Sequence, residues 1–412
     1  VQPPDGNHLE ESGGDGGMIL SDVCEFIVDC PHSTAPDEGK GYPLIRTPNV
    51  GKGRLDLNGV HRVSESVYKQ RIQRGAPRAN DLIFAREAPA GNVALVQENQ
   101  TVCLGQRTVL IRPNVQKVNP QYLVYYLLSP KPQYELLGTA NGATVAHVNL
   151  PAIRNLKIEL PEKSVQDKIG TILVTYDDLI ENNQKQIKLL EEAAQRLYKE
   201  WFVDLRFPGH ENTKIVDGVP EGWSVYPFSS KVDIMSGGTP KTSIPDYYNG
   251  KIPFYTPKDS DGAFFAYKTQ MNITEGGLKN CNSRLYPPKT VIITARGTVG
   301  KTTILAVPMA MNQSCYALKM KENDAPYYLF FALNNEIKAL QTMANGGVFN
   351  TIIGKTFDSI NIQIPKDPLI YGFEETVRPF MEQIKNKLQA NSKLVEARNR
   401  LLLKMMNGEV EV

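Results

Sequence analysis

The chain has 412 residues, of which 41% are hydrophobic, and its net charge at pH 7 is only +2. This length allows two or more hydrophobic cores, because domains usually contain about 100–200 residues. The sequence has no run of about 18 apolar residues and no basic N-terminal region followed by an apolar stretch, so we expect no membrane span, no signal peptide and a cytoplasmic location.

The first 161 residues divide into a leader and a globular segment. Residues 1–17 are acidic and rich in Gly, which predicts a flexible leader. Residues 18–161 contain short β-type runs separated by Gly, Pro and Asn, which predict an α+β domain with a mostly antiparallel sheet and one helix at 120–128. We expect the tyrosines of this helix to lie in the core and not to stack on bases: Tyr122, Tyr125 and Tyr126.

Residues 162–206 predict a long amphipathic helix. From Ile169 to Trp201 apolar residues recur in steps of four and three, and the polar Asn183 interrupts this heptad pattern once. The run from about 166 to 204 contains no Pro. At ~1.5 Å per residue, about 38 helical residues form a rod of roughly 57 Å.

The second half of the chain follows the same plan. A Gly- and Pro-rich linker at 208–222 leads into a second globular segment, 207–365, with a helix at 325–344 whose aromatic residues are expected in the core: Tyr327, Tyr328 and Phe330. Residues 366–412 predict a second amphipathic helix with a less regular pattern. Pro379 is expected to kink this helix or delay its start.

Each long helix has one apolar stripe that it must bury. Its partner could be its own globular domain, but we favour antiparallel pairing of the two helices, because a single chain must double back. The globular domains would then lie at opposite ends of a rod, related by an approximate two-fold axis. The residues expected to pair are Ile180, Ile187, Leu190 and Leu197 of the first helix and Ile384, Leu388, Leu394 and Leu401 of the second.

Internal sequence matches indicate that the chain is a duplication. The stretches from the Ala-Asn-Gly motifs at 140–142 and 344–346 to Pro161 and Pro365 match at an offset of 204. Residues 82–86 match 292–296 at an offset of 210, and the Thr-Pro pairs at 47–48 and 256–257 match at 209. The sequence therefore predicts an α+β protein with two pseudo-repeated, mostly-β recognition domains separated by two long antiparallel coiled-coil spacer helices.

The basic residues are concentrated in the globular segments. Residues 39–161 contain sixteen Lys and Arg against seven Asp and Glu, and residues 207–365 contain fifteen against twelve. Residues 162–206 have an acidic excess instead. This distribution indicates a polyanionic partner for the globular parts, with ordinary solvated charge as the alternative.

The sequence contains no complete catalytic or metal-binding motif. Residues 295–302 resemble a phosphate-binding P-loop, but Ala295 replaces its first Gly and the following residues predict a strand where the P-loop needs a helix. No adenine-methyltransferase signature occurs, and the five histidines are far apart in the chain. Five scattered cysteines without a Cys-x-x-Cys pair favour free thiols over disulfides or zinc. We therefore expect no catalytic residue, no metal site and no cofactor of the chain's own.

The order of the remaining motifs is typical of one family. Residues 160–166, Leu-Pro-Glu-Lys-Ser-Val-Gln, precede a long helix, and residues 81–86 and 291–300 form one strand-turn motif in each half. From about residue 18 onward the chain resembles the specificity subunits of Type I restriction-modification enzymes. It departs from the family pattern at the second junction, 364–370, which lacks the Gln, and at the first turn, where residues 87–91 read Glu-Ala-Pro-Ala-Gly.

The resemblance implies two target-recognition domains, 18–161 and 207–365, and two helical spacers, 162–206 and 366–412. It implies that the chain binds a bipartite, asymmetric target in double-stranded DNA and docks two methyltransferase subunits through its helices. A restriction and translocation subunit can join the complex. S-adenosylmethionine, ATP and Mg would belong to those partners. Three alternatives remain: a stand-alone DNA-binding repressor of the same architecture, an assembly scaffold held by the coiled coil, and the specificity subunit of a related combined restriction-methylation system.

Basic residues in and near the turns are the candidate DNA contacts, since Lys and Arg bind phosphates and Arg also reads guanine. Ordinary surface charge is the alternative for each residue taken alone. The helical rod would fix the gap between half-sites, within about one turn of DNA, ~34–36 Å. The candidate residues are Arg46, Lys52, Arg54, Arg86 and Arg107 in the first half, and Lys258, Arg296 and Lys301 in the second.

Overall fold

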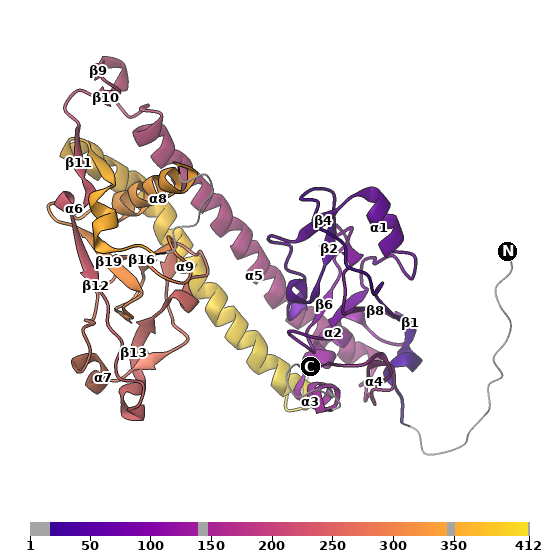
Figure 1. Ribbon diagram of the computed structural model, residues 1–412. Coiled ribbons are helices and arrows are strands. Elements are labelled where there is room, and N and C mark those ends of the chain that lie inside the picture. Colours follow the sequence, from indigo (N-terminus) through magenta and orange to yellow (C-terminus); the bar gives the residue numbers. More distant parts are fainter. Residues whose placement is uncertain (1–16, 139–146, 344–350, 411–412) are drawn as a thin grey trace. The chain divides into compact units, whose positions relative to one another are not determined.

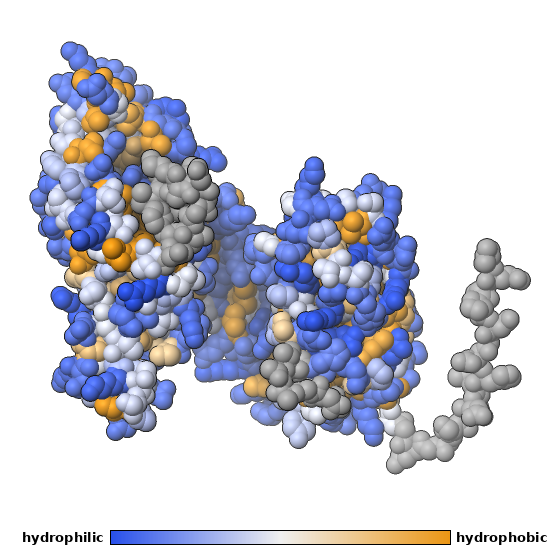
Figure 2. Space-filling model, viewed as in Figure 1, coloured by the Kyte–Doolittle hydropathy of each residue, from blue (hydrophilic) through white to orange (hydrophobic). Residues whose placement is uncertain are grey.

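The computed structural model describes residues 17–138, 147–343 and 351–410 (Figure 1). The chain divides into two compact units: unit 1 comprises Val1–Ile180 and Lys393–Val412, and unit 2 comprises Glu181–Ser392. The expected leader and the two Ala-Asn-Gly motifs lie almost entirely outside the described residues. On the face seen in Figure 2 the surface is largely hydrophilic, with apolar residues in small patches. Within the described ranges, no helix has the length and apolar character needed to cross a membrane.

Unit 1 contains a five-stranded sheet in the order β1-β8-β5-β6-β3 and a three-stranded sheet in the order β4-β2-β7. All neighbouring strands are antiparallel except the pairs β3–β6 and β2–β7, so the expected mostly antiparallel sheet is confirmed. The strands are β1 (Cys24–Asp29), β2 (Tyr42–Ile45), β3 (Gly53–Arg54), β4 (His61–Val63), β5 (Leu82–Ala85), β6 (Val93–Leu95), β7 (Cys103–Leu104) and β8 (Thr108–Pro113).

Unit 2 repeats this topology strand for strand. Its larger sheet has the order β12-β19-β16-β17-β14 and its smaller sheet the order β15-β13-β18, which confirms the duplication. A hairpin, β9–β10, lies in the expected linker, and β11 pairs with β20. The strands are β9 (Ile215–Val216), β10 (Val219–Pro220), β11 (Ser224–Pro227), β12 (Val232–Ser236), β13 (Tyr248–Tyr255), β14 (Phe265–Ala266), β15 (Asn272–Ile273), β16 (Val291–Thr294), β17 (Thr302–Leu305), β18 (Ala310–Met311), β19 (Cys315–Met320) and β20 (Asn361–Ile364).

The strand registers correct the alignment of the two copies by one residue. In both units the glycine that closes the turn donates to the carbonyl that ends the strand: Gly91 to Ala85 and Gly300 to Thr294, each at 2.9 Å. The offset here is therefore 209 and not 210, so Arg86 corresponds to Ala295 and not to Arg296. The Ala-Arg pairs at 85–86 and 295–296 look equivalent in the sequence but are not equivalent in the structure. A shift of one residue moves a side chain to the opposite face of a strand. The neighbouring Thr-Pro match is also off by one, since the backbone carbonyls of Ile45 and Tyr255 make equivalent hydrogen bonds.

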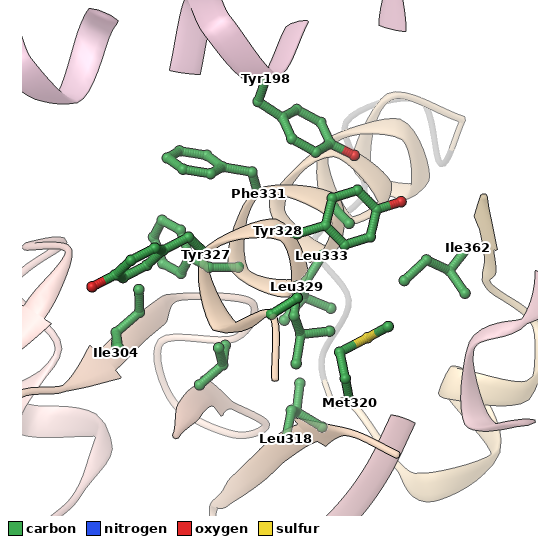
Figure 3. Close-up of a cluster of buried hydrophobic side chains, with 14 of the residues drawn as sticks. Tyr198, Ile304, Leu318, Met320, Tyr327, Tyr328, Leu329, Phe331, Leu333 and Ile362 are labelled. Carbon is green, nitrogen blue, oxygen red and sulfur yellow. The ribbon is translucent and has the colours of Figure 1, made fainter. Parts of the chain in front are cut away.

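Short helices accompany the sheets, so the expectation of one helix per half was wrong. The helices α2 and α8 have the expected places, and their aromatic residues are buried as expected, each with at most 7% of its surface exposed. Figure 3 shows Tyr327 and Tyr328 of α8 in the core of unit 2. The helices are α1 (Glu65–Arg71), α2 (Pro120–Leu128), α3 (Pro130–Gly138), α4 (Leu150–Arg154), α5 (Lys163–Tyr198), α6 (Phe228–Lys231), α7 (Glu275–Lys279), α8 (Pro326–Met343) and α9 (Asp367–Met406).

The long helices α5 and α9 pack antiparallel in each unit. In unit 1 Ile169 and Met405 share one apolar cluster, and in unit 2 Asn183 Nδ2 donates to Asn391 Oδ1 at 2.9 Å. Five of the expected pairing residues meet in the core of unit 2: Ile187, Leu190, Leu197, Ile384 and Leu388. In unit 1 Leu401 packs against the core, Ile180 is buried and Leu394 is half-buried.

Pro379 does not delay the start of the second helix, so this part of the sequence-based expectation was wrong. Helix α9 begins at Asp367 and continues through Pro379 to Met406. The side chains of Val377 and Met381, two residues to either side, are fully buried in the core of unit 2. Their packing holds the helix together where proline removes one backbone hydrogen bond.

A buried carboxylate joins the two helices in unit 1. Asp177 of α5 is 3% exposed, accepts a hydrogen bond of 2.6 Å from the Tyr125 hydroxyl and forms an ion pair with Arg398 of α9. A buried charge is stable only when it is paired and hydrogen-bonded. At the offset of 204, the corresponding residues of unit 2 are Met381 and Ala194, which are fully buried and apolar.

We predict that Asp177→Ala lowers the free energy of unfolding by about 3–5 kcal/mol, because Arg398 becomes an unpaired charge that is largely buried. The double variant Asp177→Met with Arg398→Ala copies the apolar pair of unit 2. Its loss of unfolding free energy should be smaller than the sum of the losses in the single variants Asp177→Met and Arg398→Ala. Urea denaturation of the single and double variants measures this. Losses that simply add would contradict the coupling.

The first turn of α8 depends on a side chain from α9. Glu374 is 3% exposed, and its Oε1 accepts a hydrogen bond of 2.7 Å from the Tyr328 backbone N–H. In α2 the local Asn119 side chain caps Tyr122 instead, at 3.0 Å. Burial raises the pKa of Glu374 from its ordinary value of 4.5 to about 7, against the opposing effect of the backbone donors.

The variant Glu374→Gln keeps an acceptor for this N–H and removes the titration. Because the folded pKa lies above the unfolded one, wild-type stability falls as the pH rises from about 4.5 through about 7. We therefore predict that the stability of wild type relative to the variant falls between pH 5 and pH 8, by up to about 3 kcal/mol. Urea unfolding at both pH values checks this, and an equal difference at the two values would be inconsistent with it.

Candidate nucleic-acid interface

Three loops of unit 1 meet beyond the ends of the strands. They are the 3-10 turn η2 (Thr47–Asn49) after β2, the turn 86–91 between β5 and β6, and the loop 105–107 before β8. The Thr47 hydroxyl donates to the Ala88 carbonyl at 3.4 Å, and the Arg86 N–H donates to the Arg107 carbonyl at 2.9 Å. These contacts hold the loops as one continuous surface.

The same three loops meet in unit 2. The 3-10 turn η6 (Pro257–Asp259) follows β13, the turn 295–300 joins β16 to β17, and the loop 312–314 precedes β19. The Thr298 hydroxyl donates to the Pro257 carbonyl at 3.3 Å, and the Ala295 N–H donates to the Ser314 carbonyl at 2.7 Å. Strand β17 follows the turn directly, so the P-loop interpretation is excluded, as the sequence indicated.

Five of the candidate basic residues are exposed on or beside these loops: Lys52, Arg107, Lys258, Arg296 and Lys301. Arg107 forms an ion pair, but within the described ranges the other four residues have no carboxylate at ion-pairing distance. Arg107 has a positive φ of 64° and forms an ion pair of 2.9 Å with Glu87. Cations without internal partners are suited to anchoring phosphate groups.

Arg86 has a different place from the one its sequence position suggested. Its guanidinium is only 11% exposed, pairs with Asp29 at 2.6 Å and donates to the Val148 carbonyl at 2.8 Å. It also contacts His147, which in turn contacts Glu87. The sequence could not reveal this network, because these partners are about 60 residues apart. The structure thus indicates that Arg86 stabilises the turn 86–91 through these internal contacts and does not project from its surface.

Arg54 is also engaged internally, through an ion pair with Asp178 of α5. The neighbouring Gly53 has a φ of +95°, and a Cβ atom there would lie 2.5 Å from the Asp177 carboxylate. Only glycine fits this close approach. The exposed Lys52 is therefore carried on a turn that is fixed against α5. Arg46 is half-buried, with an Nε atom that has no hydrogen-bond partner in the part of the chain that the structure describes.

The two surfaces differ in charge at corresponding positions. At the corrected offset of 209, Glu87 corresponds to Arg296 and Asn92 to Lys301. Two surfaces built from equivalent loops but with different side chains are expected to bind different partners or sequences. Among the described residues, no group of three or more His, Cys, Asp and Glu side chains is arranged to hold a metal ion.

Comparisons with known proteins give relatives of known class. A family model described as the Type I restriction modification DNA specificity domain matches residues 18–192 and again residues 220–389. The chain is 28% identical over 363 residues to the specificity subunit of the Type I restriction enzyme MjaIX from Methanocaldococcus jannaschii, with 86% of this chain and 83% of that one covered. It is 24% identical over 401 residues to the HindI specificity subunit from Haemophilus influenzae, with 81% and 87% covered.

A solved structure shares the fold. The S subunit of a Type I restriction-modification system from M. genitalium superposes with a TM-score of 0.56 at 16% identity, and 96% of this chain and 98% of that one are covered. Because the family model matches both halves and together well over half of the chain, this protein belongs to the family of Type I restriction-modification DNA specificity proteins.

Proposed function

We propose that this chain reads a bipartite, asymmetric target in double-stranded DNA for a Type I restriction-modification complex. The observation that carries the proposal is the same three-loop surface occurring twice, with opposite or altered charge at corresponding positions such as Glu87 and Arg296. One surface would read each half-site. The difference in side chains supports two half-sites of different sequence.

Affinity and specificity would come from different side chains. Exposed Lys and Arg residues anchor phosphates, which gives salt-dependent affinity without sequence information. A smaller set reaches base edges in the grooves, and Arg is the common reader of guanine. We assign Lys52, Arg107, Lys258, Arg296 and Lys301 to direct contact with DNA. Arg54 and Arg86 would act indirectly, by holding the turns in place.

We further propose that the chain is not catalytic and that methyltransferase subunits dock on its long helices. Both helices expose apolar residues outside their buried seam: Leu179 and Leu189 on α5, and Val395 and Leu403 on α9. These exposed apolar residues on otherwise polar helices are the candidate docking positions. Two methyltransferase copies would fit the duplicated helices. A restriction and translocation subunit would join them, and S-adenosylmethionine, ATP and Mg would be bound by these partners.

The direct test is a pull-down of the tagged chain from its native cells, with identification and counting of the proteins that co-purify. We expect a methyltransferase at about two copies per chain. A partnerless protein that still binds DNA would instead favour a stand-alone DNA-binding protein of this architecture. A protein that recovers partners but binds no DNA in their presence would favour a scaffold.

Removing one phosphate contact should weaken binding to all DNA sequences alike. We predict that Lys52→Ala and Arg296→Ala each lower the affinity several-fold and reduce the slope of log affinity against log salt by about one. Fluorescence anisotropy over a salt series measures both quantities. Lys131→Ala is the control, because this exposed lysine forms an ion pair with Glu159 at 2.8 Å. Equal salt slopes for all variants would contradict the assignment.

The proposed ruler role of the helices gives a separate prediction. One heptad added to α5, with a matching heptad in α9 to preserve pairing, lengthens the helices by about 10.5 Å. We expect the gap between half-sites to grow by about three base pairs, while both half-site sequences stay the same. Mapping of methylated positions in cells that carry the variant measures the gap. An unchanged gap would rule out the ruler.

A further inference from the structure

A cationic groove in unit 2 adjoins the three-loop surface described above and extends beyond it. It has a volume of about 770 Å³ and lies between α5, α8 and the turn that precedes β17. Four of its lining residues are basic: Arg196 of α5, Lys199 in the helical turn that follows α5, Lys301 just before β17 and Lys338 of α8. One acidic residue, Glu192, also lines it, so the groove has a clear positive excess.

Two of these cations have no internal carboxylate partner. Lys199 is paired with Asp204, but in the described part of the chain neither Arg196 nor Lys301 has an acidic group at ion-pairing distance. The Thr302 hydroxyl donates to Asn334 Oδ1 at 2.7 Å, which fixes the turn against α8. The groove therefore presents one guanidinium and one ammonium group that form no ion pair within the described residues, beside polar and aromatic walls that include Phe330.

The corresponding place in unit 1 is filled. Helix α2 ends at Leu128, because Ser129 is extended and Pro130 cannot donate the next backbone hydrogen bond. The chain turns there into α3, and Gln133 Nε2 donates to the carbonyls of Gly91 and Leu127 at 2.8 and 2.7 Å. Gly91 is the counterpart of Gly300, which lines the groove of unit 2. In unit 1, therefore, Gln133 blocks this site.

Unit 2 lacks the helix break. Helix α8 has no proline after Pro326 and continues to Met343, so the space that Gln133 fills in unit 1 is left open. The basic residues that line the groove of unit 2 also lack free basic counterparts in unit 1. The counterpart of Lys301 is Asn92, which bonds to the Val50 carbonyl at 2.8 Å, and the counterpart of Arg196 is Arg400, which forms an ion pair with Glu396. An open groove with free cations thus occurs in only one of the two described copies.

We propose that this groove binds a segment of the DNA phosphate backbone beside the second half-site. This inference rests on the proposed function and extends it from the loops onto helix α5. Lys301 belongs both to the groove and to the DNA-reading turn, so a strand anchored at the turn can continue toward Arg196. A guanidinium binds phosphate oxygens through two parallel hydrogen bonds, and an ammonium adds a point charge. The second unit therefore contacts more backbone than the first.

The duplicated chain supplies a matched pair of variants, Arg196→Ala and Arg400→Ala. Both change an exposed arginine at corresponding positions of the paired helices. For the full-length chain and a random-sequence duplex of about 30 base pairs, we expect Arg196→Ala to lower affinity several-fold and to reduce the salt slope by about one. Arg400→Ala should leave both quantities unchanged. Thermal unfolding of both variants verifies that each remains folded.

The outcomes separate this inference from the proposed function. Weakened binding by Lys52→Ala and Arg296→Ala with no effect of Arg196→Ala would overturn the groove and leave the function standing. Equal effects of Arg196→Ala and Arg400→Ala would also overturn it, because the site would then not be specific to unit 2. Loss of methyltransferase co-purification with unchanged DNA binding would show that the groove receives a protein. A wild-type chain without affinity for DNA would refute the function itself.

Discussion

The structure depends on one constraint: neither long helix can bury its apolar stripe alone. In each unit, segments of α5 and α9 pack antiparallel and complete a core that the β-sheets begin. The polar pair Asn183–Asn391 lies between the helices, where an unmatched partner would be costly, and thereby favours a single register. Asp178 of α5 pairs with Arg54 on the turn that carries Lys52, and the adjacent Asp177 pairs with Arg398 of α9, so helix pairing and the placement of this turn are coupled.

The two units share a topology but stabilise and use it differently. A buried ion pair in one unit is replaced by Met381 and Ala194 in the other, and Glu374 of α9 takes over the capping role that Asn119 has in α2. These substitutions preserve the fold because each leaves the buried polar groups satisfied. The surface has diverged further. A protein that recognises two unlike half-sites needs such a division, with the common scaffold kept and the exposed side chains altered.

The sequence predicted those features that follow from periodicity and composition. The two long helices, the core position of residues such as Tyr125, the duplication and the family were all accessible, since each leaves a repeated pattern. Features that depend on contacts between residues distant in the sequence could not be predicted in this way. Arg86 forms an ion pair with Asp29, and Arg54 forms one with Asp178. Because these partners are far away in the sequence, the neighbouring residues do not reveal that the two arginines are engaged internally. The alignment of the two copies was misjudged by one residue at the turn, because matching residue types do not reveal which face of a strand a residue occupies.

In the proposed function, two unlike surfaces of this one chain set the DNA target of a methylating complex. The most direct measurement maps methylated positions across the genome of the native cells, with and without the gene for this chain. We expect a methylated motif of two different half-sites separated by a fixed gap, and this motif should disappear when the chain is absent. Methylation that is unchanged by the loss of the chain would contradict it.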